Sequence, residues 1–537
     1  MSELTTAAQL KNEGNELFKN QDYVGALAKY SEALTLDDKN AVLYANRAAC
    51  NYGLNKYLDA VDDAQMATGL DPGYAKGWSR LAAARDALAD WQKSATAWQK
   101  ALDALPTTSL SPAERKQKEQ YSIGLKAAES RIEAAKKPNR SLFRMNEKDG
   151  KFPWQVAKEM LPELRRTASA TNIKSLSSSV WVIASAYEEF TEGVEKMKEL
   201  KKIPHAGAPG GFAYQGNPEG LVFLTNGLMR DDRAFHINQP DWFVIFEATA
   251  RRAWDSEGLE TIKELAQKRL KENGWDDIRP ALSVTVRAWI MRASVEGNLR
   301  EEPQAAVQYF KRALDLLEWG RTIWKDVPKD NRGAIFEDTF STGVRGLYLK
   351  MFMNAYHTDP GLNSKFPLEH LKEEAEDLLK ETDRIVRNPT KEEVDPGFVS
   401  SFISYPAGIA HSMIGHYYVQ MSRYSSDPME RMFCFITGAG AYLEAANKYP
   451  EDDELHAWYL NCTLDLMRNA GGKIGNFNQV ADRLREAAPK MMKIWAFSAL
   501  GHGGRDQKIQ ANLDNARDIM KRVAEGKLTL DDPVPLG

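Results

Sequence analysis

A 34-residue period at the start of the chain constrains the fold more than any other feature of the sequence. Residues 7–108 divide into three units of equal length: 7–40, 41–74 and 75–108. Small residues fill columns 8, 20 and 27 of the units: Gly14, Ala48 and Ala82; Ala26, Ala60 and Ser94; Ala33, Ala67 and Ala101. Large residues fill column 4 and, in two of three copies, column 24: Leu10, Tyr44 and Trp78; Tyr30 and Trp98, with Ala64 in the second unit. Because small residues let two helices approach and large ones fill the space between them, the pattern predicts stacked helix pairs.

The column pattern is typical of the tetratricopeptide repeat (TPR), in which one helix–turn–helix unit recurs at this period. Two columns depart from it. Asn51 and Arg85 stand in column 11, where Leu17 is the large residue of the first unit, and Asp38 replaces the usual proline of column 32. We expect these departures to change local detail and to leave three repeats intact.

Four segments follow from this pattern and from composition. A TPR domain is predicted over 1–137, and its last helix, 112–137, caps the third repeat with a polar outer face. A linker and irregular segment is predicted over 138–177, because Pro138 opens a polar stretch that runs to about Gly150. A second domain is predicted over 178–527, followed by a tail over 528–537.

The second domain is predicted to be mainly α-helical, so the whole chain is placed in the all-α class. Apolar and charged residues alternate at helical spacing in 178–200, 259–271 and 371–386. Weak echoes of columns 20 to 32 appear at two places: Ala306, Phe310 and Ala313; Tyr442, Ala445 and Pro450. Since these units differ in length, we favour an irregular, TPR-like helical array. The alternative is a distinct all-α or α+β domain without repeats.

Three segments interrupt the helical pattern. The Gly- and Pro-rich stretch 203–220 predicts a long loop, either a lid over a groove or, as we favour, an exposed connector. The stretch 235–246 is rich in aromatic residues. The stretch 396–421 has no Asp, Glu, Lys or Arg, but its serines and histidines are too polar for a membrane span. It predicts two buried helices around Pro406.

Composition limits the class of partner and the compartment. Lys+Arg total 71 against 75 Asp+Glu, a formal charge of −4, which argues against a strongly basic nucleic-acid binder. Cys50, Cys434 and Cys462 form no CxxC pair, and such a scattered set favours a reducing compartment. The first residues contain no basic and apolar signal segment. We therefore expect a cytoplasmic protein, with the nucleus not excluded, that binds neither nucleic acid nor membrane.

Polar residues with donor groups fall on the first helices of the three repeats. Lys11 and Asn15 are four residues apart, as are Lys76 and Arg80, and Asn46 shares column 6 with Arg80. We call these five residues the donor set. Three cations and two amides without an acid suit a carboxylate ligand, since Arg donates in pairs, Lys supplies a point charge and Asn supplies neutral donors.

The segments Leu-Lys-Asn-Glu-Gly-Asn (10–15), Leu-Tyr-Ala-Asn-Arg-Ala (43–48) and Ala-Lys-Gly-Trp-Ser-Arg (75–80) carry a family resemblance. They resemble the dicarboxylate-clamp TPR domains of heat-shock co-chaperones of the stress-inducible organizing protein type, over about residues 5–137. The resemblance implies that Lys11, Asn15, Asn46, Lys76 and Arg80 grip two carboxylates. The ligand would be the C-terminal Glu-Glu-Val-Asp of cytosolic heat-shock chaperones of the ninety- and seventy-kilodalton classes. The second domain would then bind a client or another partner.

Motifs of catalysis are missing from the sequence. Gly207–Gly211 lacks the spacing of a nucleotide loop, and His411 and His416 are five apart, which favours packing over metal ligation. We expect no catalytic residue, metal or cofactor. Two alternatives stay open: a scaffold for another acidic C-terminal peptide in trafficking or complex assembly, and an enzyme with a catalytic second domain.

The chain also contains Glu-Glu-Val-Asp at 392–395, followed by Pro396. Because an internal segment has no terminal carboxylate, we favour chance. The alternative is an intramolecular pseudo-ligand for Lys76 and Arg80.

Overall fold

The computed structural model describes residues 6–135, 150–168, 177–199, 201–204, 212–215, 219–235, 258–389 and 394–535. The chain forms two compact units. The first unit comprises Met1–Leu142, Ala253–Leu282 and Arg292–Arg312, and the second comprises Phe143–Arg252, Ser283–Met291 and Ala313–Gly537. The division does not follow chain order, whereas the limits predicted from the sequence are continuous.

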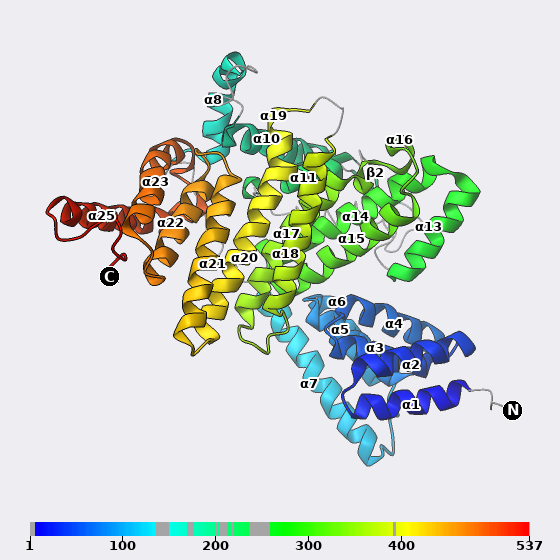
Figure 1. Cartoon of the computed structure of the whole chain (residues 1–537). Helices are drawn as coiled ribbons and strands as arrows, with labels where there is room; N and C mark the ends of the chain where they lie inside the picture. The colour runs from blue at the N-terminus through cyan, green and yellow to red at the C-terminus, as the bar shows by residue number, and fades with distance from the viewer. Residues whose placement is uncertain are drawn as a thin grey trace. The chain divides into compact units, whose positions relative to one another are not determined.

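Three helix pairs make up the repeats of the first unit (Figure 1). They are α1 (Ala7–Lys19) with α2 (Tyr23–Leu36), α3 (Ala41–Gly53) with α4 (Tyr57–Leu70), and α5 (Ala75–Ala87) with α6 (Trp91–Asp103). Gln21, Asn55 and Ala89 occupy column 15 in the turn of each pair, with φ of 62°, 58° and 56°. In each turn the next N–H bonds to the carbonyl of column 11, which closes a left-handed helix cap. The same turn in the same column confirms the three-repeat fold.

The packing of the repeats explains why columns 8, 20 and 27 hold small residues and why column 11 holds polar residues in two repeats. All nine small residues of columns 8, 20 and 27 are buried. In column 11, Asn51 donates to the carboxylate of Asp63 at 2.9 Å, and Arg85 pairs with Asp90 at 3.0 Å. A hydrogen bond or an ion pair within the repeat therefore takes the place of an apolar contact at this column.

Helix α7 (Pro112–Ala135), drawn in cyan in Figure 1, packs beside α6. Tyr121 and Ala128 are buried, and the ring of Tyr121 lies 5.8 Å from that of Trp98. Most other side chains of α7 are exposed, as a capping helix requires. The rest of the first unit comes from α13 (Leu259–Asn273) and from parts of α14 (Trp275–Asn298) and α15 (Pro303–Ile323).

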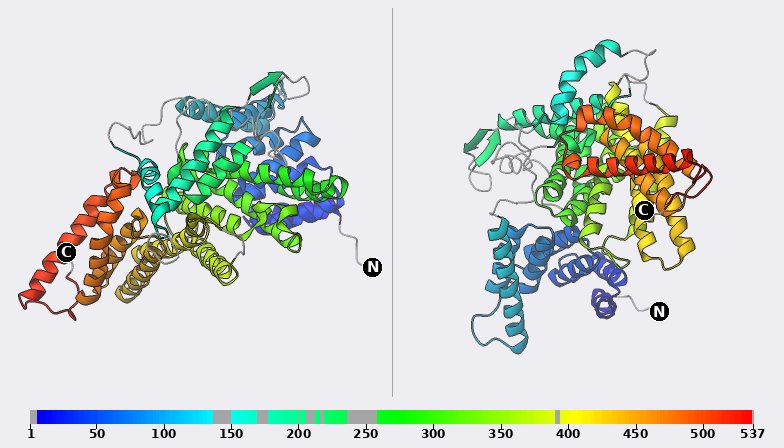
Figure 2. Two further views of the ribbon diagram at one scale, coloured as in Figure 1. Left: turned by 90° about the horizontal axis from the view of Figure 1, so that it is seen from above. Right: turned by 90° about the vertical axis from the view of Figure 1, so that its left-hand side faces the viewer.

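The second unit is mainly helical, as predicted (Figure 2). Its earlier elements are α8 (Pro153–Thr167), α10 (Ser179–Lys198), α11 (Glu219–Arg230), η1 (Asp232–Ala234), α16 (Lys329–Arg332), η3 (Ala334–Phe336), α17 (Asp338–Thr358) and α18 (Leu368–Arg387). They are followed by α19 (Pro396–Val399), η4 (Ser400–Ser404), α20 (Tyr405–Tyr424), α21 (Pro428–Asn447), α22 (Glu454–Asn469), α23 (Ile474–Trp495), α24 (Ala499–His502) and α25 (Arg505–Ala524). From α20 to α23 each long helix lies beside the next, and their lengths range from 16 to 22 residues. The array is therefore irregular.

Two intervals predicted to lack regular structure contain some. At the start of 203–220, the last residues of β1 (Lys201–Pro204) belong to a strand that pairs antiparallel with β2 (Phe212–Gln215), and α11 begins at Glu219. A hairpin thus replaces part of the predicted loop. Within 138–177, α8 buries Ala157 and Leu161 in the core of the second unit. The aromatic-rich stretch 235–246 lies outside the described residues apart from Phe235.

The uncharged stretch 396–421 is one helical run and not the predicted helix pair. α19, the π-helical turn η4 and α20 follow one another, and the backbone at Ser400 and Tyr405 stays in the right-handed helical region. Pro406 has no N–H for the carbonyl of Phe402, four residues earlier. That carbonyl accepts the Thr342 hydroxyl from α17 at 2.6 Å. In the part of the chain that the structure describes, no helix has the length and apolar character that crossing a bilayer demands.

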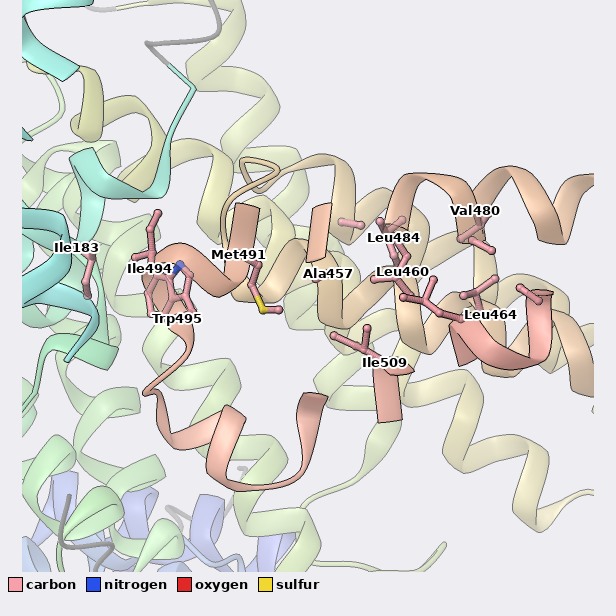
Figure 3. Close-up of a cluster of buried hydrophobic side chains, with 14 of the residues drawn as sticks. Ile183, Ala457, Leu460, Leu464, Val480, Leu484, Met491, Ile494, Trp495 and Ile509 are labelled. Atoms are coloured by element: carbon pink, nitrogen blue, oxygen red, sulfur yellow. The ribbon is translucent and has the colours of Figure 1, made fainter. Parts of the chain in front are cut away.

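A large apolar core joins both ends of the second unit (Figure 3). Leu460 and Leu464 of α22, Leu484 and Met491 of α23 and Ile509 of α25 meet there (Figure 3). The same cluster includes Ala157 of α8 near the start of the unit and Val534, which lies within the predicted tail. Shared burial therefore holds segments that are far apart in the sequence.

A buried polar network lies beside this core. Arg233 pairs with Asp231 at 2.7 Å and with Asp453 at 2.9 Å, and its guanidinium lies 4.0 Å from the Trp495 ring centroid. Tyr405 donates to Asp453 at 2.6 Å. Burial alone would raise the pKa of Asp453, but the charge and hydrogen bonds of Arg233 outweigh it and lower that pKa below its usual value.

Candidate functional site

A cavity of about 730 Å³ opens between the helices of the three repeats. It is built from α1, α2, α3 and α5. Its lining comprises Gln9, Asn12, Glu13, Asn15, Glu16, Phe18, Lys19, Tyr30, Asn46, Ala49 and Arg80. Asn15, Asn46 and Arg80 of the donor set thus face one space, whereas Lys11 and Lys76 are not part of its lining. Each of those two lysines lies one helical turn from a lining member, Asn15 or Arg80.

The two amides of the donor set touch each other. Asn46 of α3 donates its Nδ2 to Oδ1 of Asn15 on α1 at 3.3 Å, across 31 residues of sequence. Tyr30 of α2 donates its hydroxyl to the same oxygen at 2.8 Å. Stacking therefore brings column 9 of the first repeat against column 6 of the second.

Three of the five residues of the donor set are cations: Lys11, Lys76 and Arg80. Among the ion pairs of the described residues, none involves Lys11, Lys76 or Arg80. Four nearby cations do have acidic partners: Lys19 with Glu16, Lys29 with Glu13, Arg47 with Asp63 and Arg85 with Asp90. Lys76 and Arg80 are exposed and Lys11 is half-buried. No carboxylate of the described residues pairs with these three charges, so they can act on a ligand.

Two acids also line the cavity, and both have basic partners. Glu13 lies 3.0 Å from Lys29 and Glu16 lies 2.6 Å from Lys19. Hydrogen bonding and the charge of Glu13 raise the pKa of Lys29. Because exposed pairs of this kind keep only a weak residual field, an anion in the cavity meets mainly Arg80 and the neutral amide side chains of the lining.

Sequence reasoning missed the apolar part of the lining. Phe18 and Ala49 were not singled out, and Tyr30 was assigned only to the core of its repeat. One signal was present: Ala49 shares column 9 with Asn15, so both face the groove. Apolar walls next to donor groups let a peptide bury side chains while its carboxylates are bound.

The internal Glu-Glu-Val-Asp segment is described only from Val394. The Asp395 carboxylate accepts from Arg230 at 3.0 Å within the second unit. This aspartate therefore already has a basic partner.

No group of three or more His, Cys, Asp or Glu side chains is arranged to hold a metal among the described residues. His411 is half-buried, and His416 is buried with its ring 4.9 Å from that of His357.

Fold and site together define a TPR domain with a donor-lined groove that suits an anionic peptide. No family model matches the chain. Over 96 residues it is 41% identical to the heat shock protein sti1 homolog of Schizosaccharomyces pombe, and the match covers 18% of this chain and 16% of that protein. Over 101 residues it is 38% identical to the Hsp70-Hsp90 organizing protein of Triticum aestivum, covering 19% and 17% of the two chains.

Among solved structures, the chain is similar to the first TPR of Spaghetti (RPAP3) bound to the HSP90 peptide SRMEEVD. The identity is 30%, the TM-score is 0.20, and the match covers 22% of this chain and 94% of that one. The curated relatives confirm the resemblance to TPR co-chaperones. The chain matches less than a fifth of the length of these two relatives.

Proposed function

We propose that the protein is a co-chaperone adaptor. Its groove binds the C-terminal Glu-Glu-Val-Asp of cytosolic heat-shock chaperones of the ninety- and seventy-kilodalton classes through Lys11, Asn15, Asn46, Lys76 and Arg80. The observation that carries the proposal is the donor set itself: two touching amides and three cations without acidic partners among the described ion pairs, next to one cavity. Similarity to a heat shock protein sti1 homolog and to an Hsp70-Hsp90 organizing protein supports the class of partner.

The energetics suit a short peptide with a free C-terminus. A hydrogen bond to a charged group contributes about 1.5–3 kcal/mol, and ordering a flexible tail offsets part of the sum. We expect a dissociation constant in the micromolar range, which corresponds to a binding free energy of about −8 kcal/mol.

Calorimetric titration of the full chain with a free-acid Glu-Glu-Val-Asp peptide tests the groove. Lys76→Ala and Arg80→Ala should each weaken binding at least tenfold. Lys118→Ala, an exposed lysine of α7, is the matched control and should bind as the parent does. Amidating the peptide C-terminus should also weaken binding, since it removes a carboxylate.

Unchanged affinity in both groove variants would overturn the assignment. Tighter binding of an unrelated acidic tail would favour the alternative, a scaffold for another acidic C-terminal peptide in trafficking or complex assembly.

The second unit is proposed to bind an apolar segment of a client polypeptide. On α21, Met429, Met432, Phe433 and Ile436 form an apolar stripe at spacings of 3, 4 and 7, which places them on one helix face. Met429, Phe433 and Ile436 are 67%, 59% and 56% exposed. Methionine and phenylalanine side chains adapt to varied apolar partners, as a client-binding surface requires.

The protein acts, on this proposal, in the cytoplasm and without catalysis, metal or cofactor. Its groove would bring the chaperone close to whatever the second unit holds, which raises the effective concentration of one for the other.

A further inference from the structure

Tyr30 is the one member of column 24 that carries a hydroxyl, since the other two repeats have Ala64 and Trp98 there. Column 9 likewise has an amide only in the first repeat, Asn15, against Ala49 and Ala83. The pair that forms the 2.8 Å hydrogen bond is thus specific to the repeat that supplies the first two members of the donor set. General repeat packing does not explain it.

The approach of Tyr30 to Asn15 depends on Gly14. A Cβ on Gly14 would lie 2.7 Å from Cε1 of Tyr30, which is closer than real contacts allow. The missing side chain lets the buried ring pack directly against α1 at Gly14, while its hydroxyl bonds to Asn15, the next residue along the chain. Burial, with Cys50 nearby, raises the pKa of Tyr30 to about 12, so the hydroxyl keeps its proton at neutral pH and can donate.

Two donors converge on Oδ1 of Asn15, from Tyr30 and from Asn46. An amide has one acceptor oxygen and one NH2 group. A 180° rotation of the Asn15 side-chain amide would exchange its oxygen and its NH2 group. The NH2 of Asn15 would then face the NH2 of Asn46, and the buried Tyr30 hydroxyl would lose its acceptor. Both changes cost free energy, because two NH2 donors would face each other and the hydroxyl proton of the buried Tyr30 would lack an acceptor. The oxygen of Asn15 therefore stays on the side of Tyr30 and Asn46. Its NH2 group is then free to donate into the cavity that Asn15 lines.

We propose that Tyr30 is a positioning residue for peptide binding: its hydroxyl fixes the amide of Asn15 with the NH2 group directed to the ligand carboxylate. The inference rests on the proposed function of the groove. It adds a residue whose hydroxyl acts on the ligand carboxylate through Asn15.

A double-mutant cycle on the full chain tests the inference, with the free-acid Glu-Glu-Val-Asp peptide in calorimetry. Tyr30→Phe keeps the ring and removes the hydroxyl. We expect it to weaken binding roughly three- to tenfold, the range of one neutral hydrogen bond. In the Asn15→Ala background, Tyr30→Phe should have no further effect, because the group that it positions is gone.

Tyr57→Phe is the matched control. Its hydroxyl donates to Oδ1 of Asn55, also at 2.8 Å, in the turn of the second repeat. Tyr57→Phe should lower the melting temperature about as much as Tyr30→Phe does, and it should leave peptide affinity unchanged. A merely structural role for Tyr30 would make the two variants alike in both measurements.

The outcomes are distinct. If the parent binds the peptide and Tyr30→Phe binds equally well, or loses the same factor with and without Asn15, the inference is overturned and the proposed function stands. If the parent does not bind the peptide, the proposed function fails and the inference fails with it.

Discussion

Arg505 and Glu454 form a 2.7 Å ion pair in the interior of the second unit, across 51 residues of sequence. Both side chains are buried. Ser498 donates to the same carboxylate at 2.6 Å, and Arg505 also donates to the carbonyl of Trp495 at 3.0 Å. The pair thus fixes the start of α22 against the start of α25.

Removing Arg505 should destabilise the second unit strongly. Arg505→Met removes the nearer of the two cations that face the buried Glu454 carboxylate, since Arg233 remains at 3.4 Å, and breaking a buried pair typically costs about 3–5 kcal/mol. Urea unfolding followed by tryptophan fluorescence measures the loss. Arg517→Met on the same helix removes an exposed pair with Asp514 and should cost less than about 1 kcal/mol. Equal losses in the two variants would contradict this prediction.

Mild acid should weaken the second unit through His416. Burial, with His357 and Arg423 nearby, lowers the pKa of His416 to about 4. Its Nε2 is buried and has no hydrogen-bond partner among the described residues. Below about pH 6.5 His416 binds a proton in the unfolded chain but stays neutral in the folded one. The free energy of unfolding therefore falls as pH drops towards 4. The full contribution is about 3 kcal/mol.

His416→Gln should flatten this pH dependence, measured as urea midpoints between pH 7 and pH 4. Burial lowers the pKa of His411 and His456 as well, so part of the slope should remain. His502→Gln changes an exposed histidine and should leave the slope unaltered. A slope that His416→Gln does not reduce would show that acid acts elsewhere.

Thr342 should matter for the helical run through Pro406. Thr342→Val keeps the shape of the side chain and removes the donor to the carbonyl of Phe402, at a cost of about 1–3 kcal/mol. Thr322→Val, in which an exposed threonine on α15 loses a bond to its own helix, is the control with little expected effect. The measurement is the melting temperature of both variants. Similar melting temperatures would show that the hydrogen bond from Thr342 does not stabilise the helical run.

The apolar stripe of α21 should hold unfolding clients. Phe433→Ser combined with Ile436→Ser should reduce the capacity of the full chain to suppress aggregation of citrate synthase at elevated temperature, measured by light scattering. Leu362→Ser replaces a residue that is 63% exposed outside the stripe and should retain the capacity. If the stripe variant protects as well as the parent, clients do not bind there.

The repeats were predictable because the residues of their columns pack within one repeat or against its neighbour. Small residues in fixed columns located the helix pairs, and Asn15 and Asn46 met because their columns face one another. Long-range partners were not predictable in this way. Thr342 donates to the carbonyl of Phe402 across 60 residues of sequence, and Arg233 donates to Asp453 across 220. No local sequence pattern predicts either contact. The discontinuous make-up of the first unit has the same cause.

The cavity draws on four helices from all three repeats, and this has a consequence for the mechanics of the array. A ligand that fills it bonds to each repeat at once, so its binding free energy adds to the free energy that keeps the repeats stacked. Repeats that would otherwise fray one at a time must then separate together. An occupied groove would make the superhelix stiffer, and force applied to the chain would be transmitted through the bound peptide as well as through the helices.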